Sequence, residues 1–109
     1  MITITILTQE DGKITGFSAE GHSGTAPRGE DIVCAGVSSL TDSAFLGITE
    51  YLHRNVISKD SSGKLQMVLE GRPDDRTEAI LETMLLGLTA IAEAYPRALR
   101  IIKAESMRG

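Results

Sequence analysis

The chain has a single cysteine, Cys34, and one of its two histidines, His22, lies shortly before it in the sequence. An imidazole can accept the proton of a thiol, and the thiolate that remains attacks carbonyl carbons. These two residue types suffice for acyl transfer where the fold brings them within hydrogen-bond distance. Taken singly, a cysteine that packs as a small apolar residue and a histidine in a solvent-exposed loop are the commoner situations.

The segment from residue 21 to residue 30 is predicted to be a flexible loop that connects these two side chains. Gly21, Gly24 and Gly29 give its backbone conformational freedom. Such a loop can fold His22 back toward the thiol and can close over a substrate, although a plain surface loop has the same composition. We therefore expect these glycines to belong to a substrate-binding loop.

A helical pattern of apolar residues begins after Asp31, which is a favourable N-cap residue. With Asp31 as the N-cap, Cys34 occupies N3, where the helix dipole and unpaired backbone N–H groups stabilise a thiolate. The same N–H groups would provide an oxyanion hole. Asp31 either caps the helix or orients His22, and the sequence leaves both roles open. Ser38 follows Cys34 by one turn, so its hydroxyl can support the thiol.

Composition limits the other possibilities. A chain of 109 residues predicts one domain, residues 1–109. A net charge of −4 argues against nucleic-acid binding through a basic surface. No cofactor is expected, and a metal site is disfavoured because Cys34 and His22 offer only two ligands.

The expected location is the cytoplasm. One cysteine cannot form an intramolecular disulfide, which is typical of a reducing compartment. The first residues alternate in polarity and lack the basic and apolar regions of a signal peptide. We also expect no membrane association, because no segment is expected to contain the roughly 20 apolar residues of a membrane span.

The pattern of apolar residues and turn formers predicts an α+β fold with the order strand, strand, helix, strand, strand, helix, strand. The expected arrangement is a mostly antiparallel sheet of about five strands with two helices on one face. The first hairpin turns at Asp11-Gly12, and a two-residue turn there pairs Ile6 with Phe17 and Ile4 with Ala19. The expected strands cover about 2–8, 13–20, 56–59, 64–70 and 99–104. The first expected helix runs from 31 to about 53–55. The second begins at a cap formed by Asp75 with Glu78 and ends at Pro96.

The residues around the thiol resemble the signature of the ribosomal-processing cysteine protease family, Prp. That signature runs roughly Gly-His-Ala, a short loop, and then Gly-x-Asp-Ile-Val-Cys-Ala-Ala-Val-Ser-Ala-Leu. The matching residues are Gly21, His22, Gly29, Asp31, Ile32, Val33, Cys34, Ala35, Val37, Ser38 and Leu40. The departures are Ser23, Gly36 and Ser39 in place of alanine, and Thr25 where an aromatic residue is usual.

This resemblance implies a catalytic dyad in which Cys34 is the nucleophile and His22 is the general base. It implies a bacterial endopeptidase that removes a short N-terminal extension from a large-subunit ribosomal protein precursor, cutting after a hydrophobic, aromatic-rich segment. It also implies a homodimer. Thr25 lies in the predicted loop, so its departure concerns substrate preference.

Two other functions are compatible with the same residues. The motif could serve as the interaction loop of a non-catalytic ribosome-assembly adaptor, whose acidic surface binds a basic ribosomal protein. The thiol could instead act as a redox sensor, because an exposed thiolate oxidises readily. With one cysteine in the chain, any disulfide of such a sensor would join two chains.

Overall fold

The computed structural model describes residues 1–21, 28–61 and 63–105, with the side chains of residues 28–31 outside the description. The described chain has the predicted α+β class and order of elements. The strands are Ile2–Thr8 (β1), Ile14–Glu20 (β2), Val56–Ser61 (β3), Lys64–Leu69 (β4) and Leu99–Glu105 (β5). The helices are Arg28–Leu46 (α1), which continues as the π-helical segment Gly47–Tyr51 (η1), and Asp75–Ala94 (α2).

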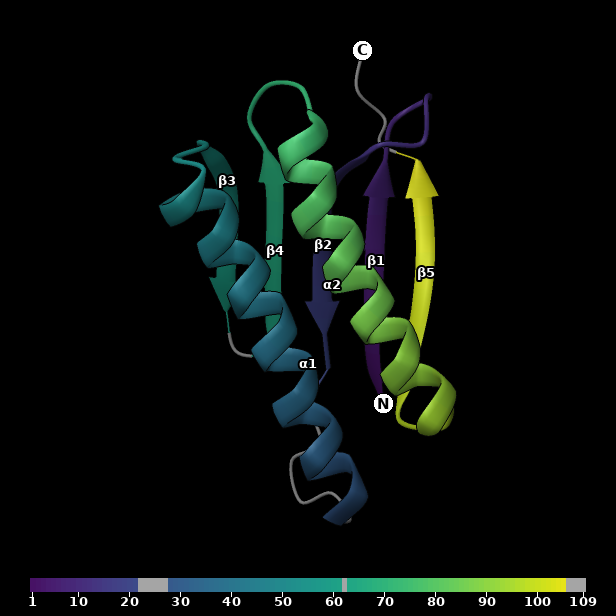
Figure 1. Ribbon diagram of the computed structural model, residues 1–109. Coiled ribbons are helices and arrows are strands. Elements are labelled where there is room, and N and C mark those ends of the chain that lie inside the picture. Colours follow the sequence, from purple (N-terminus) through teal and green to yellow (C-terminus); the bar gives the residue numbers. More distant parts are fainter. Residues whose placement is uncertain (22–27, 62, 106–109) are drawn as a thin grey trace.

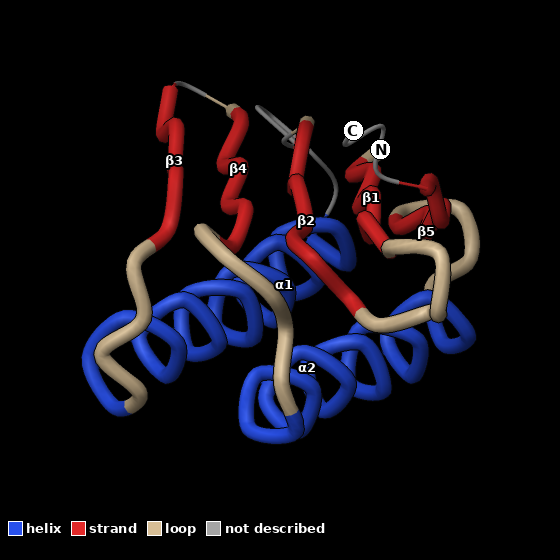
Figure 2. The backbone as a smooth tube through the Cα atoms, turned by 90° about the horizontal axis from the view of Figure 1, so that it is seen from above, coloured by secondary structure: helices blue, strands red, loops and turns tan. Residues whose placement is uncertain are grey.

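The five strands form one sheet in the order β3-β4-β2-β1-β5. β1 and β5 are parallel, and the other three pairings are antiparallel. Both helices lie diagonally across the same face of the sheet (Figure 1), and the view from above shows the opposite face without a helix (Figure 2). The predicted mostly antiparallel sheet with two helices on one face is therefore confirmed.

The predicted register of the first hairpin is also confirmed. Ile4 pairs with Ala19 and Ile6 pairs with Phe17. Ile4, Ile6 and Phe17 have no exposed surface, because alternate residues of the two strands face the helices. The core continues through neighbouring strands and both helices, and its other fully buried members include Ile14, Ile48, Met67, Leu69, Leu81 and Leu88.

The turn of this hairpin differs from the prediction. The Gln9 and Lys13 backbones are joined by an N–H···O bond of 2.9 Å, so residues 10–12 form a three-residue loop in place of the expected two-residue turn. Gly12 closes the loop with a φ of 90°. The register shifts at Thr15, which forms a β-bulge, and this extra residue restores the expected pairing further along the strands.

Gly36 of α1 and Gly47 of η1 mark close contacts with α2. A Cβ atom at Gly36 would lie 3.1 Å from Cδ1 of Ile91, and one at Gly47 would lie 3.1 Å from Cδ1 of Ile80. Both distances are shorter than ordinary carbon–carbon contacts. The glycines, which weaken a helix taken alone, therefore allow α1 to approach α2 closely.

The start of α2 differs by one residue from the prediction. Asp74, not Asp75, is the N-cap, and its carboxylate accepts hydrogen bonds of 2.9 Å from the backbone N–H groups of Arg76 and Thr77. The Thr77 hydroxyl accepts one in return from the Asp74 N–H, which completes a capping box. Glu78, the predicted partner of the cap, instead accepts a hydrogen bond of 2.6 Å from the backbone N–H of Ile14.

One segment of the described chain, Ile32–Tyr51, is long and apolar enough to cross a membrane by length and composition. The prediction that no segment meets this criterion is therefore wrong. The core helix of a globular protein passes the same test, and here Val33, Val37 and Ile48 are buried beneath the sheet. A single such helix is weak evidence for a membrane span.

Candidate active site

Cys34 lies further inside its helix than the sequence predicted. α1 begins at Arg28, so Asp31 is already helical and is not the N-cap. The unpaired N–H groups of a helix belong to its first four residues, and Cys34 lies about 9 Å beyond the helix start. The predicted N3 position of Cys34 is therefore wrong. Because the influence of the helix dipole falls off within the first turn, the dipole stabilises a thiolate at Cys34 less than the sequence predicted. An oxyanion hole built from helix-start N–H groups stays a prediction.

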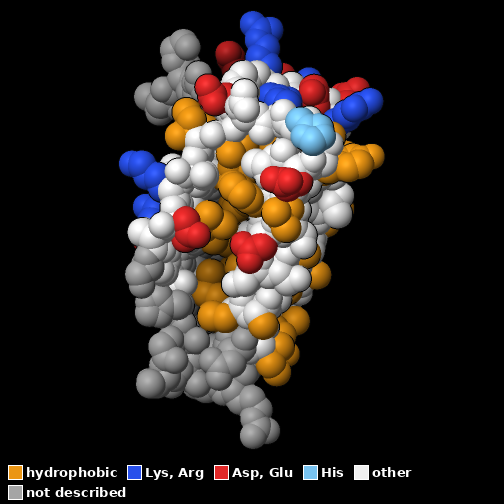
Figure 3. Space-filling model, turned by 90° about the vertical axis from the view of Figure 1, so that its left-hand side faces the viewer, with side chains coloured by type: hydrophobic (Ala, Val, Ile, Leu, Met, Phe, Trp, Pro, Cys, Tyr) orange, Lys and Arg blue, Asp and Glu red, His pale blue; other side chains and the backbone are white. Residues whose placement is uncertain are grey.

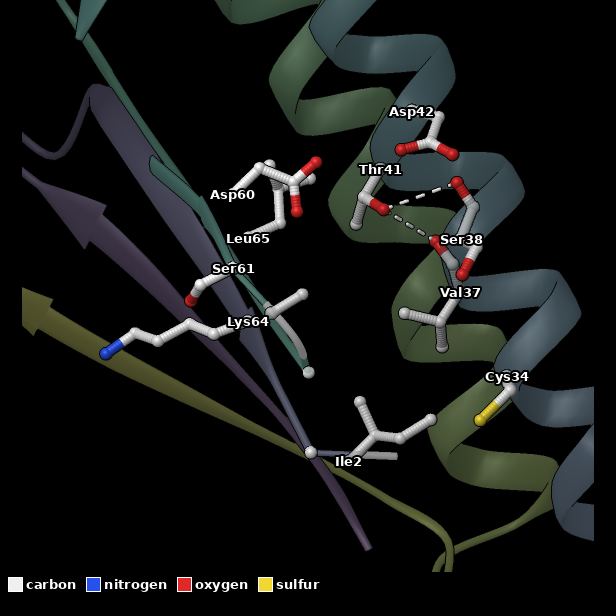
Figure 4. A pocket seen from close by; sticks show the side chains of 13 residues that line it. Ile2, Cys34, Val37, Ser38, Thr41, Asp42, Asp60, Ser61, Lys64 and Leu65 are labelled. Atoms are coloured by element: carbon white, nitrogen blue, oxygen red, sulfur yellow. Dashed lines mark hydrogen bonds between the residues drawn. The ribbon is translucent and has the colours of Figure 1, made fainter. Parts of the chain in front are cut away.

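The thiol opens into a cavity between α1 and the sheet. Cys34 is half-buried and packs against the core. The cavity has a volume of about 360 Å³. Its lining residues are Ile2, Ala19, Gly21, Cys34, Val37, Ser38, Thr41, Asp42, Asp60, Ser61, Gly63, Lys64 and Leu65. In the close-up view the Cys34 sulfur points from α1 toward the strands, near Ile2 (Figure 4).

The cavity opens at the side of the molecule where β3 is the edge strand. A space-filling view of this side shows apolar side chains exposed in a depression, with acidic side chains on both of its flanks (Figure 3). Ile2, Val37 and Leu65 supply apolar surface to the lining, and the carboxylates come from Asp42 and Asp60. The cavity can therefore hold an apolar segment in contact with the thiol and present negative charge beside it.

Ser38 lies where the sequence predicted, one turn after Cys34 on the wall of the same cavity. Thr41 follows on this wall and is almost fully buried. Its hydroxyl donates to the backbone carbonyl oxygens of Val37 at 3.0 Å and Ser38 at 3.3 Å. These bonds fix Thr41 within the helix and leave the Ser38 hydroxyl as the more exposed polar group near the thiol.

The predicted loop glycines have different positions. Gly21 lies on the cavity wall with a φ of 100°, and its N–H donates to the Gly63 carbonyl oxygen at 2.9 Å. A Cβ atom there would lie 2.5 Å from the Met1 carbonyl oxygen, so a side chain is excluded for steric reasons as well. Gly29 lies inside α1, so its assignment to the loop is wrong. Gly24 and His22 lie outside the described residues.

The cavity also includes residues that the sequence analysis did not identify. Asp42 lies one turn after Ser38, and helical spacing from Cys34 could have identified it. Asp60 and Lys64 come from the hairpin of β3 and β4, which reaches the site only because β4 pairs with β2. Nothing in the local sequence of that hairpin indicates this pairing.

The described lining favours covalent chemistry at the thiol. It supplies one thiol, the hydroxyls of serine and threonine, and two carboxylates. Among the residues that the structure describes, no three His, Cys, Asp or Glu side chains lie close enough together to hold a metal ion. The arrangement fits nucleophilic attack by Cys34 on a group held between α1 and the strands.

Comparison with known proteins identifies the family. Residues 1–100 match the family model described as cysteine protease Prp. The chain belongs to this family. It is 32% identical over 104 residues to the ribosomal processing cysteine protease Prp of Staphylococcus aureus strain Mu50, covering 93% of this chain and 97% of that protein. As a Prp family member the chain is a cysteine protease, a hydrolase, and the resemblance inferred from the sequence motif is confirmed.

Solved Prp structures share the fold over nearly the whole chain. The S. aureus Prp with a covalently linked product peptide superposes with a TM-score of 0.85 at 29% identity, covering 95% of this chain and 100% of the other. The same S. aureus protease with a substrate peptide gives a TM-score of 0.87 at 27% identity and the same coverage. The S. aureus Prp therefore binds peptides on the architecture described above.

Proposed function

We propose that this protein is an endopeptidase that removes the N-terminal extension of a large-subunit ribosomal protein precursor, with Cys34 as nucleophile and His22 as general base. The observation that carries the proposal is the position of the thiol, which projects from α1 into a cavity bounded by strands (Figure 4). The Prp relatives named for ribosomal processing support the choice of substrate.

The proposed reaction has two steps. His22 takes the proton of Cys34, and the thiolate attacks the carbonyl carbon of the scissile peptide bond. The C–N bond breaks, the amine of the C-terminal product receives the proton from His22, and a thioester remains on Cys34. Water then loses a proton to His22 and hydrolyses the thioester, which releases the N-terminal product and restores the thiol.

The shape of the cavity supports a peptide as the substrate. A volume of about 360 Å³ suits a short peptide segment more than a folded domain. Leu65 and Ala19 on the strands face Val37 on α1, so apolar side chains of the peptide would be buried on both sides. We further propose, from the family resemblance, a homodimer that acts in the bacterial cytoplasm without a cofactor.

The test is cleavage of a synthetic peptide that spans the N-terminal extension of the precursor, with the products identified by mass spectrometry. The wild type is expected to cut one bond, and Cys34→Ala is expected to reduce the rate roughly 10⁴-fold or more. His22→Ala is expected to reduce it about 10²- to 10⁴-fold. His53→Asn is the matched control, because His53 is exposed and is absent from the cavity lining, and asparagine tolerates its φ of 57°.

Cleavage by Cys34→Ala at the wild-type rate would contradict the assignment of the nucleophile. Loss of activity in His53→Asn equal to that in His22→Ala would contradict the assignment of the base. Binding of the peptide by the wild type with no cleavage would contradict the proposed reaction and favour the adaptor function. Circular dichroism of each variant shows whether its fold is intact.

A further inference from the structure

The end of β2 that leads to His22 is joined to the turn between β3 and β4. β2 ends at Glu20, Gly21 follows, and His22 is the next residue. The Gly21 N–H donates a hydrogen bond of 2.9 Å to the carbonyl oxygen of Gly63, which lies in the β3–β4 turn. Consecutive Cα atoms are about 3.8 Å apart, so a contact that fixes Gly21 also limits where His22 can lie.

An ion pair links the same two segments. Glu20 and Lys64 are register partners at the ends of β2 and β4, and the Lys64 ammonium nitrogen lies 3.3 Å from the Glu20 carboxylate. The ammonium group points away from the cavity (Figure 4), so its contact with Glu20 is made outside the cavity. Opposite charges across an antiparallel strand pair attract one another, and like charges repel. The ion pair therefore holds the β3–β4 turn against the end of β2.

The backbone around Gly21 is closely packed. A Cβ atom there would lie 2.5 Å from the Met1 carbonyl oxygen, so Gly21 both packs against the Met1 backbone and bonds to Gly63. Gly21 and Gly63 line the same cavity as Cys34. These contacts fix the point at which the chain leaves β2, at the border of the cavity that contains the thiol.

We infer that Glu20 and Lys64 are positioning residues for the reaction: by holding the β3–β4 turn against the end of β2, they set the approach of His22 to the Cys34 thiol. The inference rests on the proposed function, in which His22 is the general base, and it adds two residues that act through that base. A base must lie within hydrogen-bond reach of the proton it takes, so displacement of His22 slows the chemical step. Binding of the peptide in the cavity does not depend on this proton transfer.

The test is a charge-reversal cycle, measured with the synthetic peptide that spans the N-terminal extension. Glu20→Lys and Lys64→Glu each place like charges opposite one another, so each is expected to lower kcat about two- to tenfold. KM is expected to stay within about twofold of the wild-type value. The Glu20→Lys/Lys64→Glu double variant restores opposite charges, and its kcat should return to within about twofold of the wild type.

The two single variants also separate positioning from a direct effect of charge on the reaction. They change the local charge in opposite directions, so a direct effect would raise kcat in one variant and lower it in the other. Displacement of His22 lowers kcat in both. Because 47% of the Lys64 side chain and 60% of the Glu20 side chain are exposed, their ion pair contributes little to stability, and the variants should fold.

The matched controls are Lys13→Glu, which breaks the ion pair with Asp11 at the other end of the sheet, and Glu82→Lys at an exposed position of α2. Both should keep the wild-type kcat. Circular dichroism identifies a variant that fails to fold, and Glu20→Gln and Lys64→Gln then take the place of the reversals, with an expected loss of kcat of about twofold.

Three results would overturn the inference and leave the peptidase function standing. They are an unchanged kcat in both single variants, opposite changes of kcat in the two, and a double variant as slow as the single ones. An equal loss of kcat in the controls would overturn it as well. A wild type that cleaves no peptide would overturn the proposed peptidase function together with the inference.

Discussion

The two ends of the sheet differ. At the end where β1 turns into β2, side chains of α2 and of its N-cap residue accept hydrogen bonds from backbone N–H groups. At the opposite end, α1 and the strands enclose an open cavity. At the first end, Glu78 accepts from the Ile14 N–H and Asp74 caps α2. At the second end, Cys34 and Gly21 border a space of about 360 Å³. The two ends lie at opposite extremes of the strands (Figure 1).

This difference shows how a small fold can separate stability from chemistry. At the hairpin end the hydrogen bond from the Ile14 N–H to Glu78 joins strand to helix, and the capping box completes the start of α2, which fixes the layers relative to one another. The buried Thr15 hydroxyl at this end finds no hydrogen-bond partner among the described residues. At the cavity end, α1 and the strands are separated by a space in which they make no packing contacts, and this space exposes the nucleophile. Substitutions at the hairpin end should therefore change stability with little effect on the reaction, and substitutions at the cavity end should affect activity.

The largest effect on stability is expected from Gly21→Ala, compared with Gly12→Ala at the hairpin end. Both glycines have positive φ, which costs a substituted residue about 1–2 kcal/mol. A Cβ atom at Gly12 meets no atom within 4 Å, whereas one at Gly21 approaches the Met1 carbonyl oxygen. We expect the free energy of unfolding to fall by about 2–4 kcal/mol for Gly21→Ala, since a backbone atom must also move.

Peptide cleavage distinguishes the two variants further. Gly21 precedes His22, so Gly21→Ala should lower kcat as well as stability, and Gly12→Ala should leave kcat unchanged. Denaturation with urea measures the stability of each variant, and the peptide assay measures its kcat. Equal losses of stability and activity in the two variants would contradict the division between the ends.

A smaller loss of stability is expected for Glu78→Ala. This substitution leaves the N–H of Ile14 without its acceptor in a residue that is 1% exposed. An unsatisfied buried N–H group costs about 1–2 kcal/mol. Glu82→Ala, one turn further along α2 on an exposed position, is the matched control. Glu78→Ala should lower the urea midpoint and leave kcat/KM unchanged, and a drop in kcat/KM with unchanged stability would oppose our account.

The smallest expected effect is the contribution of Asp74 to the pH dependence of stability. Its hydrogen bond from the Thr77 N–H, together with that from Arg76 and the charge of Arg54, holds the pKa of Asp74 below its ordinary value of 3.8. Because the native pKa is the lower one, the stability from Asp74 is present above the ordinary value and is lost as pH falls through the native value.

Asp74→Asn separates the cap from the charge. Asparagine is a good N-cap, so the helix should persist while the titration disappears. The difference in urea midpoint between about pH 6 and about pH 3 should become smaller in the variant. Asp11→Asn, which removes another carboxyl of lowered pKa at the first turn, serves as the comparison. An unchanged pH dependence in Asp74→Asn would refute this role for the carboxylate.

The sequence was most informative where short-range pattern and burial agree. The alternation of apolar residues determined the register of Ile4 and Ile6 against β2, even though the turn type was wrong. The wrong turn type did not change the predicted register, because the bulge at Thr15 compensates for the longer loop and keeps the apolar face of the strand buried. The cap of α2 was misplaced by one residue because Asp74 and Asp75 are both capping residues by type.

The site was predictable only in part. The motif identified Cys34, and helical spacing placed Ser38 beside it, but the start of α1 was wrong because glycine and proline in the sequence favoured a longer loop. Asp60 reaches the cavity through the order of the strands, which hairpin signals do not determine. Long-range pairing of this kind depends on the whole core and not on local residue types.

The most direct test of the central claim is labelling of the wild type with a chloromethyl ketone built on the N-terminal product peptide. The thiolate of Cys34 should displace chloride and form a thioether, which adds the mass of the chloromethyl ketone reagent less that of hydrogen chloride. Our account predicts one adduct, located on Cys34 by tandem mass spectrometry, with activity lost in proportion to labelling. Loss of activity without an adduct on Cys34, or full activity with Cys34 completely labelled, would contradict it.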